Sequence, residues 1–290
     1  MIELTYFIYG SAFVVSALIM LYLAKSAFDL ATPFKLKDQL TENDNPAVGI
    51  VLCGYLLGVI AVLVGSFMGE GEGAMDLSGF LDDMGPTAFY GLLGMALLLF
   101  AGLINDILIL REFSNTEEIL KKKNLSVAVL IATTYLGSGL IIAGSLKGGE
   151  DILSVLLFFL IAQAALVLFS IVYQKATSYD DQKELGENKN LACGLAFAGN
   201  ILAYSILLMK AGTMDSADGE ILLLVDRLKY FAYYAISGAI LLPILRFVND
   251  MAFLPGAKLA VEIVRDRNTN AGLLEACLAV SMALVLIITL

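Results

Sequence analysis

Long apolar stretches without charged side chains are the feature that most limits how this chain can fold. Most contain 20 residues or more, enough for a helix rising 1.5 Å per residue to cross a hydrocarbon layer of about 30 Å. Their apolar residues are consecutive and do not alternate with polar ones, which favours helices over barrel strands. The stretches, of which the last contains Glu275, are Leu4–Ala24, Asn45–Gly69, Met84–Asn105, Asn124–Leu146, Ile152–Gln174, Asn190–Met209, Tyr230–Leu245 and Asn268–Leu290. The sequence therefore predicts an all-α polytopic membrane protein with eight transmembrane helices.

Composition excludes several classes of function. The 290 residues are 59% hydrophobic and include no His and no Trp, which excludes a His-ligated haem, a His-based catalytic triad and the usual zinc sites. Three cysteines, Cys53, Cys193 and Cys277, stand alone in apolar segments and are predicted to be small buried thiols. The sequence contains no glycine-rich phosphate loop and no nucleophile–base set, and its net charge of −10 disfavours nucleic acid. We therefore expect no enzymatic activity, no metal and no cofactor.

The basic residues predict how the helices are oriented. The connections after spans one, three, five and seven carry three, four, three and four of the 18 Lys and Arg residues. The connections after spans two, four and six carry only Lys147, Lys210, Arg227 and Lys229. Because basic connections stay in the cytoplasm, both termini are predicted to lie on the outer, periplasmic side. Lys229 and Arg246 flank the short seventh span, and we expect them to lengthen it by extending to the two interfaces.

A short sequence motif that begins with Asn occurs at the start of each even-numbered span. The four copies begin at Asn45, Asn124, Asn190 and Asn268. The first and third lie 145 residues apart and the second and fourth 144, which predicts a tandem duplication with halves 1–145 and 146–290. Each half is a four-helix transmembrane repeat made of two hairpins. Four spans per half give both halves one orientation, so the repeat is parallel and not inverted.

Each of these asparagines is predicted to begin a helix at the cytoplasmic face. Asn is a preferred N-cap, and Pro46 after the first of them suits the first helical position. Short amphipathic segments precede the caps, as at 34–43, 116–124 and 257–268, and we expect them to lie along the membrane surface. Ser114 and Glu117 have the spacing of a capping box for the second of these segments.

At these residues the chain resembles the YjfL-like family, an uncharacterised family of small bacterial inner-membrane proteins. Members carry a four-span unit with an Asp-Asn-x-Ala phrase before the second span and an Arg-Asn-x-Ala phrase before the fourth. The matching residues here are Glu42–Ala47, Arg267–Ala271, Glu187, Asn190 and Ala192. The sequence departs from the pattern at Lys123–Ser126 and at Lys189. The resemblance covers nearly the whole chain as two tandem copies, implies the cell inner membrane and transfers no catalytic residue.

Glu275 is an acidic residue inside a predicted span. It lies seven residues after Asn268, about 10 Å below the cytoplasmic interface, where the other units have Leu52, Ile131 and Phe197. A carboxylate in hydrocarbon costs at least a few kcal/mol unless it finds a partner, a proton or water. Glu275 is therefore either an ion- or proton-handling group or a protonated or hydrogen-bonded residue in helix packing.

Other polar side chains also lie deep within the predicted spans. Asn200, Tyr55 and Thr134 each follow their repeat Asn by ten residues, about three helical turns. Gln163 lies in the middle of span five. These side chains either line a polar path or join neighbouring helices by hydrogen bonds.

Several basic residues stand beside two of the predicted helix N-termini. They are Lys121, Lys122, Lys123, Arg265 and Arg267. An anionic ligand or a lipid head group can bind where such bases meet the partial positive charge of a helix N-terminus. Alternatively, these bases only set the orientation of the chain.

The sequence leads to two hypotheses about function. In the first, the protein binds or transports a small solute or ion between its two halves, through a polar lining formed by Glu275, Asn200, Tyr55, Thr134 and Gln163. In the second, it is a non-transporting scaffold whose cytoplasmic turns recruit a peripheral protein. The lipid bilayer is a partner in both cases, and both are compatible with a homo-oligomer.

Overall fold

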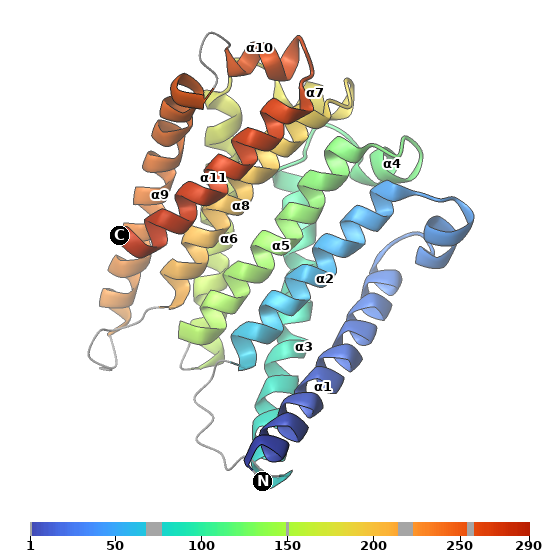
Figure 1. Ribbon diagram of the computed structural model, residues 1–290, viewed down its shortest axis with the longest axis vertical. Helices are drawn as coiled ribbons and strands as arrows, with labels where there is room; N and C mark the ends of the chain where they lie inside the picture. The colour runs from blue at the N-terminus through green and yellow to red at the C-terminus, as the bar shows by residue number, and fades with distance from the viewer. Residues whose placement is uncertain (1, 68–76, 149–150, 214–222, 254–257) are drawn as a thin grey trace.

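The computed structural model describes residues 2–67, 77–148, 151–213, 223–253 and 258–290, and this part of the chain contains helices and no strands (Figure 1). Eight of the helices are long and apolar enough to cross a membrane, which confirms the predicted all-α polytopic fold. They are α1 (Ile2–Ala31), α2 (Pro46–Phe67), α3 (Leu77–Leu108), α5 (Leu125–Gly148), α6 (Ile152–Ala176), α8 (Leu191–Thr213), α9 (Leu224–Phe253) and α11 (Thr269–Thr289).

Two of the long helices extend well beyond the uncharged stretches that predicted them. α3 begins at Leu77 and not at Met84. α9 runs from Leu224 to Phe253, whereas its uncharged stretch covers only Tyr230–Leu245. The absence of charge therefore sets a lower bound on helix length, because the ends of a span lie among head groups and water, where charged side chains are tolerated.

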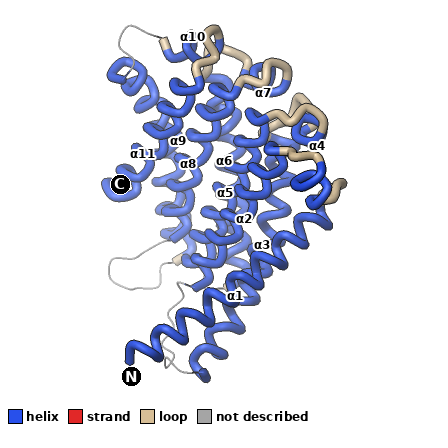
Figure 2. The backbone as a smooth tube through the Cα atoms, turned by 45° about the vertical axis from the view of Figure 1, so that its right-hand side comes forward, coloured by secondary structure: helices blue, strands red, loops and turns tan. Residues whose placement is uncertain are grey.

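Four short helices connect the long ones at one end of the bundle, which we call the cap end. They are η1 (Asp38–Glu42, a π-helix), α4 (Asn115–Leu120), α7 (Asp181–Gly186) and α10 (Leu259–Val264). Three of them fall in or overlap the predicted amphipathic segments, and α7 takes the corresponding place after α6. Figure 2 shows α4, α7 and α10 together at this end, with the N-terminus at the other. The hydroxyl of Ser114 accepts a hydrogen bond from the N–H of Glu117 at 3.3 Å, which is one of the two hydrogen bonds of the predicted capping box.

The even-numbered spans, α2, α5, α8 and α11, stand side by side in one row (Figure 1). All four begin at the cap end and run in the same direction. Three of the odd-numbered spans cover the grooves between them. α3 packs on α2 and α5, α6 on α5 and α8, and α9 on α8 and α11. The fold is therefore an array of four hairpins placed in the order of the sequence.

Small residues bring the helices of the row into close contact. A methyl group added at Gly54 of α2 would lie 2.3 Å from the Cα of Ala132 in α5. One added at Gly199 of α8 would lie 2.2 Å from the Cα of Ala276 in α11. Backbones this close admit only glycine, and small residues are the usual means by which membrane helices approach one another.

The boundary between the two halves is packed in the same way. In α5, a methyl group at Gly144 would lie 2.2 Å from the carbonyl oxygen of Met209 in α8, and one at Gly148 would lie 2.0 Å from that of Gly212. The two helices that form the boundary thus touch along their backbones. The expectation that a solute path runs between the halves is not met along this contact.

The prediction that all three cysteines are buried is wrong for two of them. Cys193 is buried, but Cys53 in α2 and Cys277 in α11 are exposed on the surface of the bundle. The physical reason is that lipid replaces water around these helices. A hydrophobic residue therefore gains little from facing the protein interior, and hydrophobicity alone does not separate the inner face from the outer one.

Candidate functional site

The four repeat asparagines form the same structure in each unit at the cap end. Their side-chain oxygen accepts a hydrogen bond from the backbone N–H two residues later, at 3.1 Å in all four units. The residue before each asparagine has a positive φ between 43° and 48°. These residues are Asp44, Lys123, Lys189 and Arg267. A left-handed residue followed by an Asn cap thus turns the chain from each short helix into the next span.

The amide nitrogen of the asparagine links each unit to the following one. The donors Asn45, Asn124 and Asn190 reach the backbone carbonyls of Ile119, Leu185 and Ile263, respectively, at 2.8–2.9 Å. The same nitrogen reaches the side chain six residues earlier in all four units: Gln39, Glu118, Glu184 and Glu262. The asparagines therefore hold the array together in addition to beginning its helices.

The bases predicted to contact an anion or lipid lie at the cap end beside acidic neighbours. Lys121 and Lys122 pair with the glutamates one turn earlier, at 3.3 and 2.5 Å. Lys123 donates to the backbone carbonyl of Asn43 in the preceding unit at 2.6 Å. Arg265 pairs with the adjacent Asp266 at 2.8 Å, and Arg267 is exposed. The contacts shown for these bases are thus local ion pairs and one link between units.

Glu275 lies in a buried cluster of polar side chains in the second half. Its Oε1 is 2.6 Å from Nε of Arg246 in α9 and accepts a hydrogen bond from Nδ2 of Asn200 in α8 at 3.0 Å. The hydroxyl of Tyr173 in α6 donates to the same oxygen at 3.4 Å. Only 6% of Glu275 is exposed. The ion pair and hydrogen bonds replace the hydration that the carboxylate loses at this depth.

Arg246 lies in a different place from the one that the sequence predicted. The expectation that it extends to the interface is not met, because it turns inward to Glu275 and only 19% of its side chain is exposed. Its guanidinium carbon lies 4.9 Å from the centre of the Tyr173 ring, which stacks on Phe197 at 4.8 Å. The depths of Arg246 and Glu275 within their spans are the feature of the sequence that could have identified this ion pair. A base near the cap end of span seven and an acid two turns into span eight lie at similar depth, and a buried acid requires a partner.

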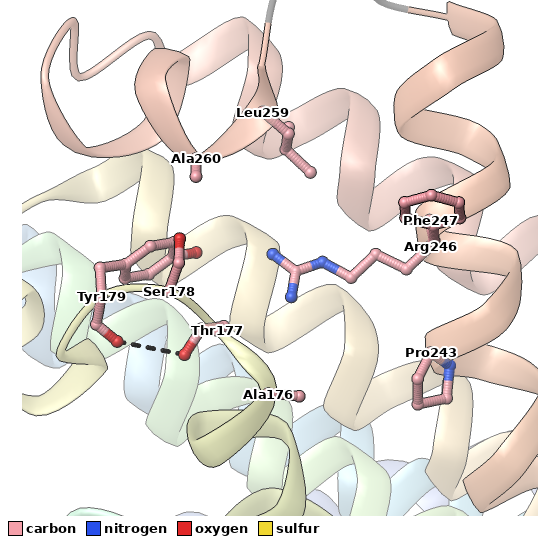
Figure 3. A pocket seen from close by; sticks show the side chains of 9 residues that line it. All are labelled: Ala176, Thr177, Ser178, Tyr179, Pro243, Arg246, Phe247, Leu259 and Ala260. Atoms are coloured by element: carbon pink, nitrogen blue, oxygen red, sulfur yellow. Dashed lines mark hydrogen bonds between the residues drawn. The ribbon is translucent and has the colours of Figure 1, made fainter.

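A cavity of about 460 Å³ opens beside this cluster at the cap end. Figure 3 shows the guanidinium group of Arg246 directed into it, toward the turn that carries Thr177, Ser178 and Tyr179. The hydroxyl of Thr177 is already used, since its oxygen lies 3.2 Å from the carbonyl oxygen of Tyr179 (Figure 3) and its proton is shared with the carboxyl group of Asp181. Residues of α9 and α10 form the other walls. One anchored base among mostly apolar walls is a lining typical of sites for small molecules.

The first half has different side chains at the corresponding positions. Ile131 and Gly102 stand 144 residues before the acid and the base. The ring of Tyr135 lies over Gly102, where an added methyl group would be 2.5 Å from the Tyr135 hydroxyl oxygen. Tyr55 takes the place of Asn200, and its ring lies 5.4 Å from that of Tyr135. The Tyr55 hydroxyl is buried and has no hydrogen-bond partner among the described residues. An aromatic cluster beside a cavity of about 250 Å³ thus replaces the ion pair.

Gln163 makes contacts that hold helices together, whereas Thr134 bonds within its own helix. The hydroxyl of Thr134 donates to the carbonyl of Ile131, one turn earlier, at 2.8 Å. Gln163 donates to Asn105 at 2.6 Å and accepts from Ser138 at 3.1 Å, which joins α3, α5 and α6 across the boundary of the halves. The five predicted polar residues therefore belong to three places. Two lie in the second half with the ion pair, two in the first half and one at the boundary.

Asp181, at the start of α7, is another buried carboxyl group at the cap end and lies outside the spans. It accepts hydrogen bonds from the hydroxyl of Thr177 at 2.5 Å and from the thiol of Cys193 at 3.6 Å. Burial raises the pKa of Asp181 to about 6, and the negative charge of Glu275 acts in the same direction. These two hydrogen bonds and the positive charge of Arg246 oppose the shift.

We expect the folded protein to lose stability as the pH rises through this range. The pKa of Asp181 is higher in the folded chain than in the unfolded one, so its stabilising contribution is complete below about pH 4 and lost above about pH 6, at most on the order of 3 kcal/mol. Melting temperatures in detergent at about pH 4 and pH 7.5 measure this loss, which should be smaller in Asp181→Asn. Equal losses in the two proteins would contradict the assignment.

Comparison with known proteins identifies the family. The model of the family described as Domain of Unknown Function (DUF350) matches residues 1–146 and again residues 149–290. The UPF0719 inner membrane protein YjfL of Escherichia coli (strain K12) is 27% identical over 124 residues, which cover 43% of this chain and 83% of that protein. The protein of the same name in Escherichia coli O157:H7 matches to the same extent. No solved structure matches the chain. The chain is a multi-pass inner-membrane protein that belongs to the DUF350 family and carries two copies of its domain in tandem.

Proposed function

We propose that the protein binds a small anionic solute in the cavity beside Arg246, as the first step of its transport. The observation that supports this is a guanidinium group that is fixed in place and still faces open space (Figure 3). Glu275 engages two of its nitrogens, Nε at 2.6 Å and Nη2 at 3.4 Å. A guanidinium group has five N–H donors, so others remain for a carboxylate or phosphate oxygen.

The pairing with Glu275 gives the proposed site a way to release its ligand. An incoming anion shares Arg246 with Glu275, and its departure restores the original ion pair without leaving a buried charge uncompensated. Tyr173 holds the guanidinium group from one face, so the base does not need to be reordered for each binding event. The site occurs only in the second half, since Gly102 stands where Arg246 would be in the first.

Glu275→Gln is expected to abolish flux while the protein remains folded, because an amide does not balance the charge of Arg246. Proteoliposomes measure the uptake of labelled acetate, succinate and inorganic phosphate, together with the current on a supported membrane. Tyr55→Phe is the matched control, since it removes a polar atom at the position corresponding to Asn200 in the first half. Its flux should equal that of the unmodified protein. Undiminished flux in Glu275→Gln removes this residue from the mechanism.

A scaffold that recruits a peripheral cytoplasmic protein is the alternative, and the close packing of α5 on α8 favours it. A transporter requires a path, whereas backbones in contact at Gly144 and Gly148 leave no room for one at the boundary of the halves. Cross-linking pull-downs with segments 34–45 and 114–124 replaced distinguish the two roles. A lost partner supports the scaffold, while retained partners with lost flux support transport. Neither proposed role includes an enzymatic activity or a cofactor.

We also propose that the cap end faces the cytoplasm and both termini face the periplasm. The support is the positive-inside rule, because the connections at the cap end carry most of the basic residues. Lys122→Cys, in a chain with Cys53 and Cys277 replaced by Ser, provides a reporter. A membrane-impermeant maleimide should label it only after the inner membrane is permeabilised. Labelling in cells whose inner membrane is intact would reverse the orientation.

A further inference from the structure

Within the described residues, the groups that link neighbouring units make no contact with a further unit at either end of the array of hairpins. Each of the first three repeat asparagines donates to a backbone carbonyl of the next unit. Asn268, in the last unit, reaches only Glu262 within the described part of the chain. The acceptor carbonyl always belongs to the residue five before the following asparagine, and in the first unit that residue is Leu40. The donor at one end of the molecule and the acceptor at the other therefore match.

The contacts between neighbouring row helices also follow one register. The ninth residue after one asparagine meets the eighth residue after the next, as Gly54 meets Ala132 and Gly199 meets Ala276. Near the cap end, the second residue after one asparagine meets the fourth after the next. Examples are Ser126 against Gly194, and Ala192 against Gly272. The register predicts which residues would meet if the row continued.

Applied to the two open ends, the register pairs α11 with α2. The second and ninth residues after Asn268 are Asn270 and Cys277, both exposed. The fourth and eighth residues after Asn45 are Gly49 and Cys53, and the latter is exposed. The nearest heavy atom to a methyl group added at Gly49 would lie 3.8 Å away, in contrast to the close contacts of the equivalent Gly194 and Gly272. The small residues of an inter-unit contact are thus present on α2 without a partner helix.

Helix α1, in the layer of odd-numbered spans, packs mainly against one helix of the row. α3, α6 and α9 each lie over a groove between two helices of the row, whereas α1 packs against α2 at the open end. Only 11% of the α1 span is buried, compared with 39%, 50% and 28% for α3, α6 and α9. A further row helix beside α2 would supply the missing wall of this groove.

The residue before the repeat asparagine carries opposite charge in the first and the last unit. Lys123 and Lys189 occupy the residue before their asparagine and donate to a carbonyl of the preceding unit at 2.6 and 3.3 Å. Arg267 has this position in the last unit, and the first unit alone has an acid, Asp44. Continuing the row would bring Asp44 beside the turn 265–267, which holds Asp266 between Arg265 and Arg267 and so keeps a net positive charge. Opposite charges at this contact favour its formation and oppose the pairing of like ends.

We propose that a second copy of this chain continues the row, with α2 of one copy packed against α11 of the next. The contact is heterologous, so it repeats around a ring or along a line in the membrane. The two helices would approach most closely near the cap end. Farther from the cap end, the two faces carry the larger residues Ile60, Val64 and Ile288. The proposal is independent of what the cavity binds.

Cross-linking through the native cysteines tests this contact. In the proposed contact Cys277 of one copy faces Cys53 of the next, while within one chain α5 and α8 separate them. A short membrane-permeable bismaleimide, applied at a high lipid-to-protein ratio, should link the unmodified protein into dimers and higher species. Cys53→Ser alone and Cys277→Ser alone should give none. A mixture of the two variants, carrying different tags, should give dimers that contain both tags.

The outcomes of this experiment are distinguishable. Dimers within either single variant would show a symmetric contact and overturn the proposal, as would the absence of dimers in the unmodified protein. Leu168→Cys in the Cys277→Ser background controls for random collision. Leu168 lies on the exposed side of α6, at about the depth of Cys277 by helix rise. Dimers formed equally well by this control would also count against the contact.

Gly49→Leu provides a second test that does not depend on cysteine reactivity. A methyl group added at Gly49 makes only an ordinary van der Waals contact within one chain, with Leu40 at 3.8 Å, but a larger side chain there would separate two copies in the proposed contact. We expect an unchanged melting temperature and loss of the cross-linked species. Gly272→Leu is the matched variant inside the array, where an added methyl group lies 2.2 Å from the carbonyl oxygen of Ala192, so the monomer itself should lose stability. Full cross-linking of a folded Gly49→Leu protein contradicts the proposal.

Discussion

Arg246→Met, in a protein that keeps Glu275, is expected to destabilise the second half by roughly 3–5 kcal/mol. Glu275 is 6% exposed and depends on the guanidinium group 2.6 Å away for charge balance. Methionine retains much of the volume of the side chain but removes the charge. Asn200 and Tyr173 alone then face a carboxylate at membrane depth, where an unpaired charge is costly.

The double variant separates the effect of charge from the effect of packing. Arg246→Met combined with Glu275→Met removes both charges, and apolar replacements of buried ion pairs are often neutral or stabilising. We therefore expect the double variant to recover most of the stability that the single variant loses. Unfolding free energies from SDS titration in mixed micelles provide the comparison. A double variant no more stable than Arg246→Met would mean that lost packing, and not the unpaired carboxylate, causes the effect.

An exposed ion pair on the same helix serves as the control. Lys229 lies 2.9 Å from Asp226 on α9, with side chains 71% and 48% exposed. Lys229→Met is expected to change the unfolding free energy by less than about 1 kcal/mol, because solvent screens such pairs. A similar loss at both positions would indicate that α9 tolerates no change of charge at all, and burial would not then explain the effect at Arg246.

The local features of this fold are readable from sequence because they depend on neighbouring residues only. Apolar length predicts a span, Asn followed by an apolar run predicts a cap, and Ser114 with Glu117 predicts the start of α4. Each of these signals is complete within a few residues. The number of spans and the caps at Asn45, Asn124, Asn190 and Asn268 could be predicted for this reason.

The arrangement of the helices could not be predicted in the same way. The length of the repeat divides the chain into two halves, but packing at Gly144 and Gly148 makes the halves parts of one continuous row. Small residues on a helix do not indicate which other helix packs against them. The exposure of Cys53 and Cys277 and the inward turn of Arg246 depend on neighbours distant in sequence, since lipid and protein interior are both apolar.

Asn190→Ala is expected to destabilise the protein by roughly 3 kcal/mol or more, from the loss of a cap and of two buried hydrogen bonds. Its oxygen caps α8, and its nitrogen reaches both Glu184 and the carbonyl of Ile263 at 2.8 Å. Asn190 is 1% exposed, so water does not replace these bonds. Unfolding by SDS in mixed micelles measures the loss.

Asn268→Ala is the matched comparison, because the same residue type in the same turn makes no contact with a following unit within the described residues. Asn268 caps α11 and reaches Glu262, and both residues are partly exposed, so we expect a loss of about 1 kcal/mol for the isolated chain. The difference between the two variants isolates the bond that joins one hairpin to the next. Equal losses would show that capping alone accounts for the asparagines. The recurrence of Asn at all four turns would then reflect how each helix begins and not how the units of the array are joined.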